Sequence, residues 1–121
     1  MKTALILGVS GQDGAYLSQL LLNKGYSVIG SSRDAQSNSF RNLELLGIFN
    51  DVEKVSISIN DFRSVLQSIN KFKPTEIYNL AGQSSVSLSF DQPVETFESI
   101  VLGNINILES IKFSDNSIKY Y

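Results

Sequence analysis

Five short runs of β-prone residues alternate along this chain with segments of helical periodicity. The runs occupy residues 3–9, 26–32, 52–59, 76–81 and 117–121. Strands that alternate with helices form parallel sheets, because each helix returns the chain to the end of the sheet from which the next strand starts. The sequence therefore predicts an α/β fold in which a parallel sheet of about five strands carries helices on both faces.

The first helix is expected at residues 14–25. Leu17, Leu20 and Leu21 recur at the spacing that places side chains on one helical face, and we expect this face to pack on the sheet. Gly25 follows the last turn, at the position where a residue of left-handed conformation commonly ends a helix.

A second helix is expected after Asn60 and Asp61, either of which can cap its first turn. One or two further helical turns are expected at residues 40–47, in the connection between the second and third strands. The second helix carries its apolar residues on one side: Phe62, Val65, Leu66, Ile69 and Phe72.

Gly8, Gly11 and Gly14 stand at even spacing in LILGVSGQDGAYL, between the first strand and the first helix. In a turn that binds a diphosphate, Gly8 permits the turn, Gly11 lets the backbone approach the ligand, and Gly14 lets the helix pack on the strand. The free N–H groups of the helix would face the phosphates. The alternative is a glycine-rich turn that binds nothing, since the spacing differs from G-x-G-x-x-G.

The end of the second strand carries Ser31, Ser32, Arg33 and Asp34. In sheets of this kind, a residue about 20 positions after the glycines contacts the ribose of a dinucleotide. Arg33 can pair with the 2′-phosphate of NADP, whereas Asp34 can accept from the free 2′-hydroxyl of NAD. We expect NADP as the cofactor, with NAD as the alternative.

Charge and composition exclude several classes of site and partner. The net charge is −2 and the pI is about 5.0, so no basic field draws in nucleic acid or anionic lipid. The chain has no cysteine and no histidine, which removes thiol chemistry and the commonest metal ligand, so no metal site is expected. The apolar N-terminal run is too short for a signal peptide. We expect a cytoplasmic protein without a membrane partner.

Two stretches, GVSGQDGAYL at residues 8–17 and KPTEIYNLAGQSSVSLSF at residues 73–90, resemble the GDP-mannose 4,6-dehydratase family. This family belongs to the extended short-chain dehydrogenases/reductases, whose cofactor domain is Rossmann-like. The resemblance covers the whole chain and roughly the N-terminal third of a family member. It implies a lyase that removes water from GDP-mannose, in which a tightly held NADP takes a hydride from the sugar and returns it.

The resemblance carries over to the cofactor half of the family's site. Its phosphate-binding turn corresponds here to Gly8, Ser10, Gly11, Gln12 and Asp13. Its 2′-phosphate arginine corresponds to Arg33. The end of its fourth strand, where the backbone approaches the riboses, corresponds to Leu80, Ala81 and Gln83, and Ser84 matches a residue close to the sugar.

Two departures from the family bear on the cofactor. Asp34 stands where the family has a second arginine, which leaves NAD as an alternative to NADP. Ser58 and Ile59 stand where the family has an Asp-Leu pair under the adenine. This change removes a side-chain acceptor for the exocyclic amine, so we expect weaker cofactor binding.

The longest helix is expected from Pro93 to about Phe113, and its apolar residues cover more than one face. In proteins that resemble this one, the matching helix joins a four-helix bundle between subunits. Sheet packing takes one side of the helix, so we expect Leu102, Ile105 or Ile107 to stay exposed unless another chain covers them. The sequence therefore predicts a homo-oligomer through residues 93–113, a symmetric dimer being the simplest form.

The family's catalytic groups have no counterpart here. No Tyr-x-x-x-Lys occurs in residues 1–121, and neither does the strand end that supplies a Ser/Thr and a Glu, so no catalytic residue is predicted. We expect residues 1–121 to form one NAD(P)-binding domain, truncated before the catalytic and substrate-binding parts. It would be a fragment, a truncated gene product or half of a split enzyme, inactive alone and binding GDP-mannose only when the missing half completes it. The alternatives are a non-catalytic dinucleotide-binding or assembly module and a folded remnant without a ligand.

Overall fold

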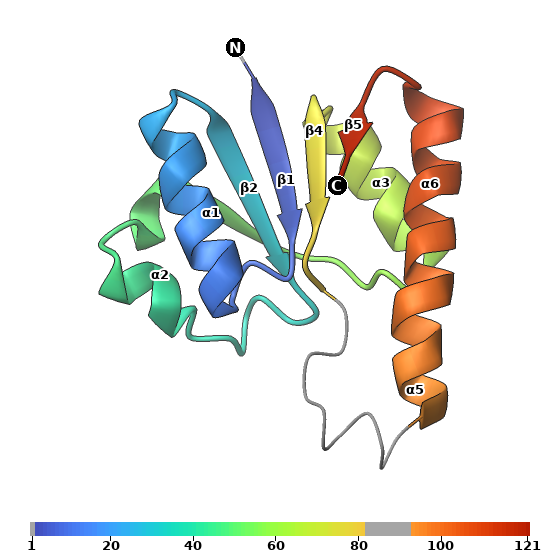
Figure 1. Cartoon of the computed structure of the whole chain (residues 1–121), viewed down its shortest axis with the longest axis horizontal. Helices are drawn as coiled ribbons and strands as arrows, with labels where there is room; N and C mark the ends of the chain where they lie inside the picture. The colour runs from blue at the N-terminus through green and yellow to red at the C-terminus, as the bar shows by residue number, and fades with distance from the viewer. Residues whose placement is uncertain (1, 82–92) are drawn as a thin grey trace.

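The computed structural model describes residues 2–81 and 93–121, which form one parallel sheet with helices on both faces (Figure 1). The strands lie in the order β3-β2-β1-β4-β5, and every neighbouring pair is parallel. This is the Rossmann-like order, so the predicted fold class is confirmed. The strands are β1 (Thr3–Leu7), β2 (Ser27–Ser32), β3 (Val52–Ser56), β4 (Glu76–Asn79) and β5 (Lys119–Tyr120).

Helices occupy the connections between the strands. They are α1 (Gln12–Asn23), α2 (Arg41–Leu45), α3 (Phe62–Phe72), α5 (Pro93–Phe97) and α6 (Gly103–Ser114), with a 3-10 turn η1 (Phe49–Asp51) and a π-helical segment η2 (Glu98–Leu102). Within the described ranges, no helix combines the length and the apolar character needed to cross a membrane.

The central strand β1 contributes to two separate hydrophobic clusters. Ala4 and Ile6 pack on the side of α1 and α2, whereas Leu5 and Leu7 pack on the side of α3 and α6. These side chains alternate because successive residues of a strand point to opposite faces. All four are at most 1% exposed. The uninterrupted apolar run of β1 therefore reflects burial on both faces, as a parallel sheet requires.

α1 packs on the sheet through Leu17 and Leu21, as the leucine spacing predicted, but not through Leu20. Gly14, Ala15, Ser18 and Leu21 are buried, whereas Leu20 is 51% exposed. The Ser18 hydroxyl donates to the Gly14 carbonyl at 2.7 Å, so the buried serine is satisfied within the helix. The expectation for Leu20 is wrong, because small residues let the first turns of α1 approach closely and thereby fix the rotation of the helix.

The ends of α1 and α3 follow the rules for helix capping. α1 is followed by Gly25 with φ +86°, as the sequence predicted. Of the two candidate caps before α3, Asp61 is the one used, since its carboxylate accepts from the Arg63 N–H at 3.1 Å. Asn60 is left available for another role.

The segment predicted as one long helix is helical from Pro93 to Ser114 but contains the π-helical segment η2. The Asn104 side-chain amide donates to the Ile100 carbonyl within this segment. A side chain that bonds a helix carbonyl in this way interrupts the regular ladder of backbone hydrogen bonds. Gly103 follows, and a Cβ there would lie 2.7 Å from Cδ1 of Ile59, so the helix backbone runs directly against this side chain.

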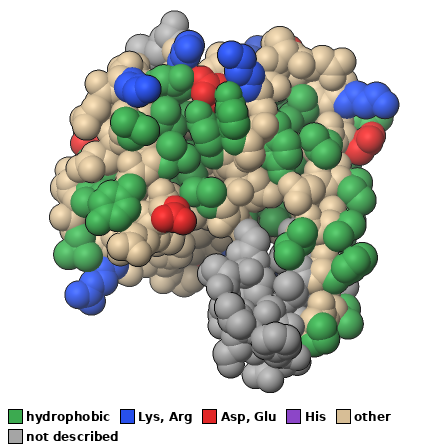
Figure 2. All heavy atoms as spheres, in the orientation of Figure 1, with side chains coloured by type: hydrophobic (Ala, Val, Ile, Leu, Met, Phe, Trp, Pro, Cys, Tyr) green, Lys and Arg blue, Asp and Glu red, His purple; other side chains and the backbone are tan. Residues whose placement is uncertain are grey.

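The outer side of α5–η2–α6 is apolar and exposed, as the sequence predicted. Leu102 and Ile105 are 40% and 50% exposed. Ile107, in contrast, is fully buried between α6, α3 and the sheet, so the expectation for this residue is wrong. Figure 2 shows hydrophobic side chains along the whole length of this helix. The other exposed apolar residues are Val94, Phe97, Ile100, Val101, Leu108 and Phe113.

Candidate functional site

The carboxyl ends of β1 and β4 meet in the middle of the sheet. From β1 the chain goes on to β2 and β3 on one side, and from β4 it goes on to β5 on the other. In open parallel sheets such a topological switch point opens the crevice in which ligands bind. The turn from β1 to α1, with its three evenly spaced glycines, lies at this point (Figure 1).

Gly8 closes this turn against the ends of two neighbouring strands. Its φ is +81°, a conformation that favours glycine, and a Cβ here would lie 2.7 Å from the Leu80 carbonyl oxygen. Its N–H donates to the Ser31 carbonyl at 3.0 Å. Backbone geometry alone therefore explains why this position is a glycine.

Gly14 allows α1 to start in contact with the turn. A Cβ on Gly14 would lie 2.8 Å from both the Cα and the carbonyl oxygen of Val9. This contact is the close packing that the sequence predicted for this position. It also brings the first turn of α1 next to the carboxyl end of β1.

Gly11 differs from the other two glycines because the fold does not require it. Its φ of −74° and ψ of 171° suit any residue, and a Cβ there would meet only the Gly8 carbonyl oxygen, at 3.9 Å. Gly11 is the N-cap of α1, and no side chain caps the helix. A side chain at position 11 would therefore extend into open space at the start of α1, whose first N–H groups no side chain caps.

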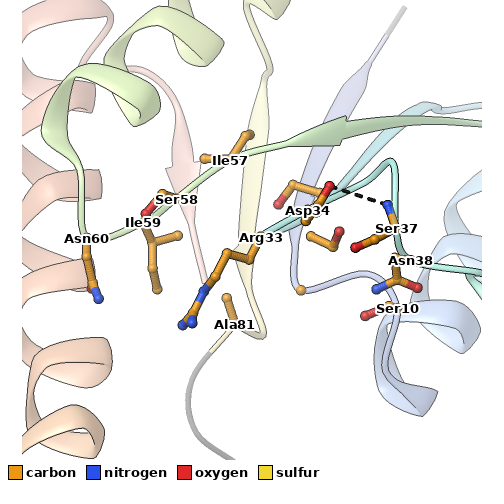
Figure 3. Close-up of a pocket in the computed structure, with 13 residues that line it drawn as sticks. Ser10, Arg33, Asp34, Ser37, Asn38, Ile57, Ser58, Ile59, Asn60 and Ala81 are labelled. Atoms are coloured by element: carbon orange, nitrogen blue, oxygen red, sulfur yellow. Dashed lines mark hydrogen bonds between the residues drawn. The ribbon is translucent and has the colours of Figure 1, made fainter.

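A pocket of about 510 Å³ opens beside this turn (Figure 3). The carboxyl ends of β1, β2, β3 and β4 and the segments that follow them form its walls. The lining residues are Gly8, Ser10, Ser31, Ser32, Arg33, Asp34, Ser37, Asn38, Ile57, Ser58, Ile59, Asn60 and Ala81. The pocket is thus long enough to run from the glycine turn, past the end of β2, to the residues that follow β3.

The structure gathers most of the residues that the sequence predicted for this site. Gly8, Ser10, Arg33 and Ala81 line the pocket. Four predicted residues form the adjoining start of α1, and Leu80 lies exposed at the end of β4. The four are Gly11, Gln12, Asp13 and Gly14. Gln83 and the predicted sugar-site residue Ser84 lie outside the described residues.

Arg33 and Asp34 play different parts at the end of β2. The Asp34 carboxylate accepts from the N–H groups of Gln36 at 3.1 Å and Ser37 at 3.3 Å. Hydrogen bonds from the Ser37 side chain and from these N–H groups hold the pKa of Asp34 below its usual range. Asp34 thus organises the loop after β2, whereas the exposed Arg33 side chain reaches across the pocket toward Ala81 (Figure 3).

Hydrogen bonds hold the walls of the pocket in place. The Asn42 side chain of α2 donates to the Ser10 carbonyl at 3.0 Å and fixes the glycine turn. The Ala35 N–H donates to the Ser56 hydroxyl at 2.8 Å, and the Ile57 N–H donates to the Ser32 carbonyl at 3.0 Å. The loops after β2 and β3 are therefore tied to each other, so the space between them is built into the fold.

A polar cluster fixes the end of β4 on the other side of the crevice. The Asn79 amide donates to the Asn104 side chain at 3.2 Å and to the Tyr120 hydroxyl at 3.1 Å. The side-chain oxygen Oδ1 of Asn79 accepts from the Ala81 N–H at 3.1 Å. Residues from β4, β5 and α6 together position the backbone at Ala81.

Sequence reasoning missed four of the lining residues: Ser37, Asn38, Ile57 and Asn60. Ile57 and Asn60 follow β3, and the carboxyl ends of parallel strands meet at one edge, so their place along the chain was a usable signal. Ser32 and Asn60 also carry buried side-chain oxygens that have no hydrogen-bond partner within the described part of the chain. In that part, no group of three or more Asp and Glu residues could hold a metal ion.

Comparisons with known proteins agree with this geometry. The sequence profile of the GDP-mannose 4,6 dehydratase family matches residues 5–121. A GDP-mannose 4,6-dehydratase from Yersinia enterocolitica is 34% identical over 130 residues, which cover 100% of this chain and 34% of the relative. The human GDP-mannose 4,6 dehydratase is 37% identical over 99% of this chain and 34% of its own length. The chain thus spans about a third of the length of these relatives.

Solved structures share the fold of this chain. A UDP-glucose 4-epimerase from Thermus thermophilus, in complex with NAD, superposes with a TM-score of 0.78 at 27% identity. The match covers 92% of this chain and 34% of the epimerase. An L-threonine dehydrogenase from Clostridium difficile superposes with a TM-score of 0.79 at 27% identity, over 99% of this chain and 35% of the dehydrogenase.

Proposed function

Because this chain belongs to the GDP-mannose 4,6-dehydratase family, we propose that residues 1–121 are the cofactor-binding part of a nucleotide-sugar dehydratase and that they bind NADP. Gly11 is the observation that carries the proposal. The fold tolerates a larger residue there, yet the position borders the uncapped N-terminus of α1. A glycine in that place suits a ligand whose diphosphate approaches the backbone.

The pocket offers a place for each part of the dinucleotide. The diphosphate faces the start of α1, where the N–H groups and the helix dipole favour an anion. Arg33 lies at the end of β2 and is exposed, so its guanidinium can pair with a 2′-phosphate. Leu80 and Ala81, at the end of β4, would contact the ribose nearer the nicotinamide. When bound, the cofactor would take a hydride from the sugar and return it.

We propose that residues 1–121 bind the cofactor without converting GDP-mannose. The Tyr-x-x-x-Lys pair of the family has no counterpart in the sequence. Proton transfer to and from the sugar needs a positioned acid and base, and the described pocket is lined by hydroxyl, amide and guanidinium groups besides the Asp34 carboxylate. Dehydration of the sugar would then depend on groups from a further polypeptide segment.

Isothermal calorimetry of the parent chain and of Gly11→Val with NADP tests the proposal. We expect the parent to bind and the variant to bind at least 100-fold more weakly, because a branched side chain would occupy the path of the diphosphate. Glu53→Val, an exposed position of β3 outside the pocket, serves as the control and should bind like the parent. A Gly11→Val variant that binds NADP as tightly as the parent would remove the basis for this assignment.

A second candidate function is that of an assembly module, which the exposed apolar side of α5–η2–α6 favours. Eight large apolar residues of this helix are at least 37% exposed: Val94, Phe97, Ile100, Val101, Leu102, Ile105, Leu108 and Phe113. Such a surface is typical of a contact with another protein chain. In this reading the chain serves association, and NADP binding is absent or incidental.

A further inference from the structure

The end of the pocket farthest from the glycine turn is formed by the four residues that follow β3. They are Ile57, Ser58, Ile59 and Asn60. If the diphosphate lies at α1 and the first ribose beside Arg33, the attached purine extends past β2 and reaches these residues. The inference below therefore rests on the proposed function.

The side chains at this end of the pocket can bind a purine ring but do not select one purine over another. Ile57 and Ile59 are apolar and largely buried, and they offer surface to a flat ring. Ser58 lies between them, and Figure 3 shows Asn60 and Arg33 extending in the same direction on either side of Ile59. The polar groups available to the edge of the ring are therefore a hydroxyl and a carboxamide.

Both of these groups can donate as well as accept a hydrogen bond. The backbone N–H of Ser58 donates to the Ser64 hydroxyl at 3.1 Å, whereas no hydrogen bond among the described residues engages the Ser58 hydroxyl. The Asn60 side-chain oxygen has no hydrogen-bond partner among the described residues. This oxygen is buried, and no described hydrogen bond holds the amide in that orientation against a flip.

The neighbouring carboxylates, which can only accept hydrogen bonds, already accept them from the backbone of this chain. Asp34 accepts from two N–H groups of its own loop. Asp61 accepts from the Arg63 N–H and caps α3. None of the four residues that follow β3 carries a carboxylate, the side chain that could only accept from a purine.

We propose that this site binds dinucleotides of 6-oxopurines as readily as those of adenine. The amino group of adenine donates and its ring N1 accepts. In hypoxanthine both roles are reversed, because O6 accepts and N1–H donates. Rotation of the Ser58 hydroxyl and of the Asn60 amide exchanges donor and acceptor on the protein as well. The hydrogen bonds to hypoxanthine therefore form with little loss of binding free energy.

The test compares NADP with nicotinamide hypoxanthine dinucleotide phosphate by calorimetry on the same chain. We expect the two dissociation constants to agree within about threefold. Ser58→Asp introduces a group that only accepts, and it should weaken the hypoxanthine form at least tenfold more than the adenine form, because two acceptors would then face each other. Ser37→Asp adds the same charge elsewhere in the pocket, so it should leave the ratio of the two constants unchanged.

The outcomes separate this inference from the proposed function. If the unmodified chain binds NADP but binds the hypoxanthine form more than tenfold more weakly, the inference is overturned and the proposed function stands. If neither dinucleotide binds, both are overturned. If Ser58→Asp and Ser37→Asp change the ratio equally, the discrimination does not arise at Ser58 and the assignment of the base site is wrong.

Discussion

The two ends of the sheet differ in how completely the chain covers them. At the β3–β2–β1 end, helices lie on both faces and the side chains of β1 and of β2 from Val28 on are buried or nearly so, although Glu53 and Ser56 of the edge strand β3 are exposed. At the β4–β5 end, Tyr121 is 62% exposed and stacks on the ring of Tyr78 with 5.0 Å between ring centroids. The helix on the far side of these strands exposes apolar residues along its length (Figure 2). Side chains of the chain itself cover most of the β3–β2–β1 end. The β4–β5 end, in contrast, leaves apolar surface exposed that could contact another protein chain.

This difference matches the two candidate functions. The pocket and the glycine turn draw most of their residues from the covered end. The surface suited to association belongs to the other end. Changes at the two ends should therefore have separable effects, one on ligand binding and one on assembly.

The largest effect is expected from Gly8→Ala at the covered end. The added Cβ would lie 2.7 Å from the Leu80 carbonyl oxygen, and the residue would have to keep a φ of +81°. Strain and overpacking together should lower the free energy of unfolding by about 3–5 kcal/mol. Urea denaturation followed by circular dichroism measures the change.

Gly11→Ala is the matched control for Gly8→Ala. Its Cβ meets only one atom, at 3.9 Å, and its backbone is extended, so stability should change by less than about 1 kcal/mol. Equal stability losses in the two variants would mean that the glycine turn is not shaped by its contact with β4.

The next largest effect is expected on self-association through the exposed apolar side of α5–η2–α6, at the β4–β5 end of the sheet. Ile105 and Leu108 are 50% and 52% exposed, and burial of such side chains contributes about 1.5–3 kcal/mol each, enough for a dimer at micromolar concentration. Light scattering across a dilution series should show a dimer of the parent chain. The double variant Ile105→Asp, Leu108→Asp should be a monomer with an unchanged circular dichroism spectrum.

Ile107→Asp provides the contrast on the same helix. This side chain is fully buried, so the variant should unfold rather than merely dissociate. A parent chain that stays monomeric at high concentration would contradict the assembly surface.

Arg33→Ala tests the cofactor preference at the covered end. A charge-assisted pair to phosphate contributes about 1.5–3 kcal/mol, so the variant should lose most of the preference for NADP over NAD. The ratio of the two dissociation constants, measured by calorimetry, reports the change. A parent chain that binds NAD more tightly than NADP would shift the assignment to Asp34 and the ribose hydroxyl.

The smallest expected change in stability comes from Glu76 of β4, which lies beside Tyr26 and Tyr78. Its carboxylate accepts from the hydroxyls of Tyr26 and Tyr78, each at 2.6 Å, and these hydrogen bonds, Tyr26 first, lower the pKa of Glu76 from its usual 4.5. A lowered pKa contributes stability that is present above the unfolded value and is lost as the pH falls through the folded one.

Glu76→Gln should therefore be less stable than the parent by about 1 kcal/mol at pH 7. The difference should shrink as the pH drops below about 4.5. Thermal melts at a series of pH values measure both results. A difference between the two proteins that is independent of pH would mean that the charge of Glu76 does not contribute.

Much of the sheet could be predicted from the sequence because its determinants are local. The continuous apolar run of β1 and the capping residues act within a few positions, and so does the glycine turn. The exposure of Leu20 could not be read from the leucine spacing, which was right for Leu17 and Leu21, since the close approach of Gly14 to Val9 sets the rotation of α1. The burial of Ile107 likewise depends on contacts with α3 and the sheet, which are distant in sequence.

In the candidate site, too, some residues could be predicted from local sequence patterns and others could not. The glycines, Arg33 and Ala81 follow strand ends that the sequence marks clearly. Ser37 and Asn38 belong to a loop whose course is set by hydrogen bonds to Asp34 and by contact with neighbouring loops, so no periodic pattern points to them. Asn60 was a candidate helix cap, and only the structure shows that Asp61 takes that role.

The position of β1 between β2 and β4 has a consequence for how the chain folds during synthesis. Thr3 lies beside Thr75, 72 residues further along, whereas its partner on the other side, Ser27, comes much earlier. At about 5–20 residues per second, the ribosome needs roughly 4–14 s to make the intervening chain. Until then β1 has one unpaired edge in the middle of the future sheet. The β1–β4 pairing has the largest sequence separation of the strand pairs in the described sheet, so we expect it to slow folding and to leave β1 open to wrong strand pairing until it forms.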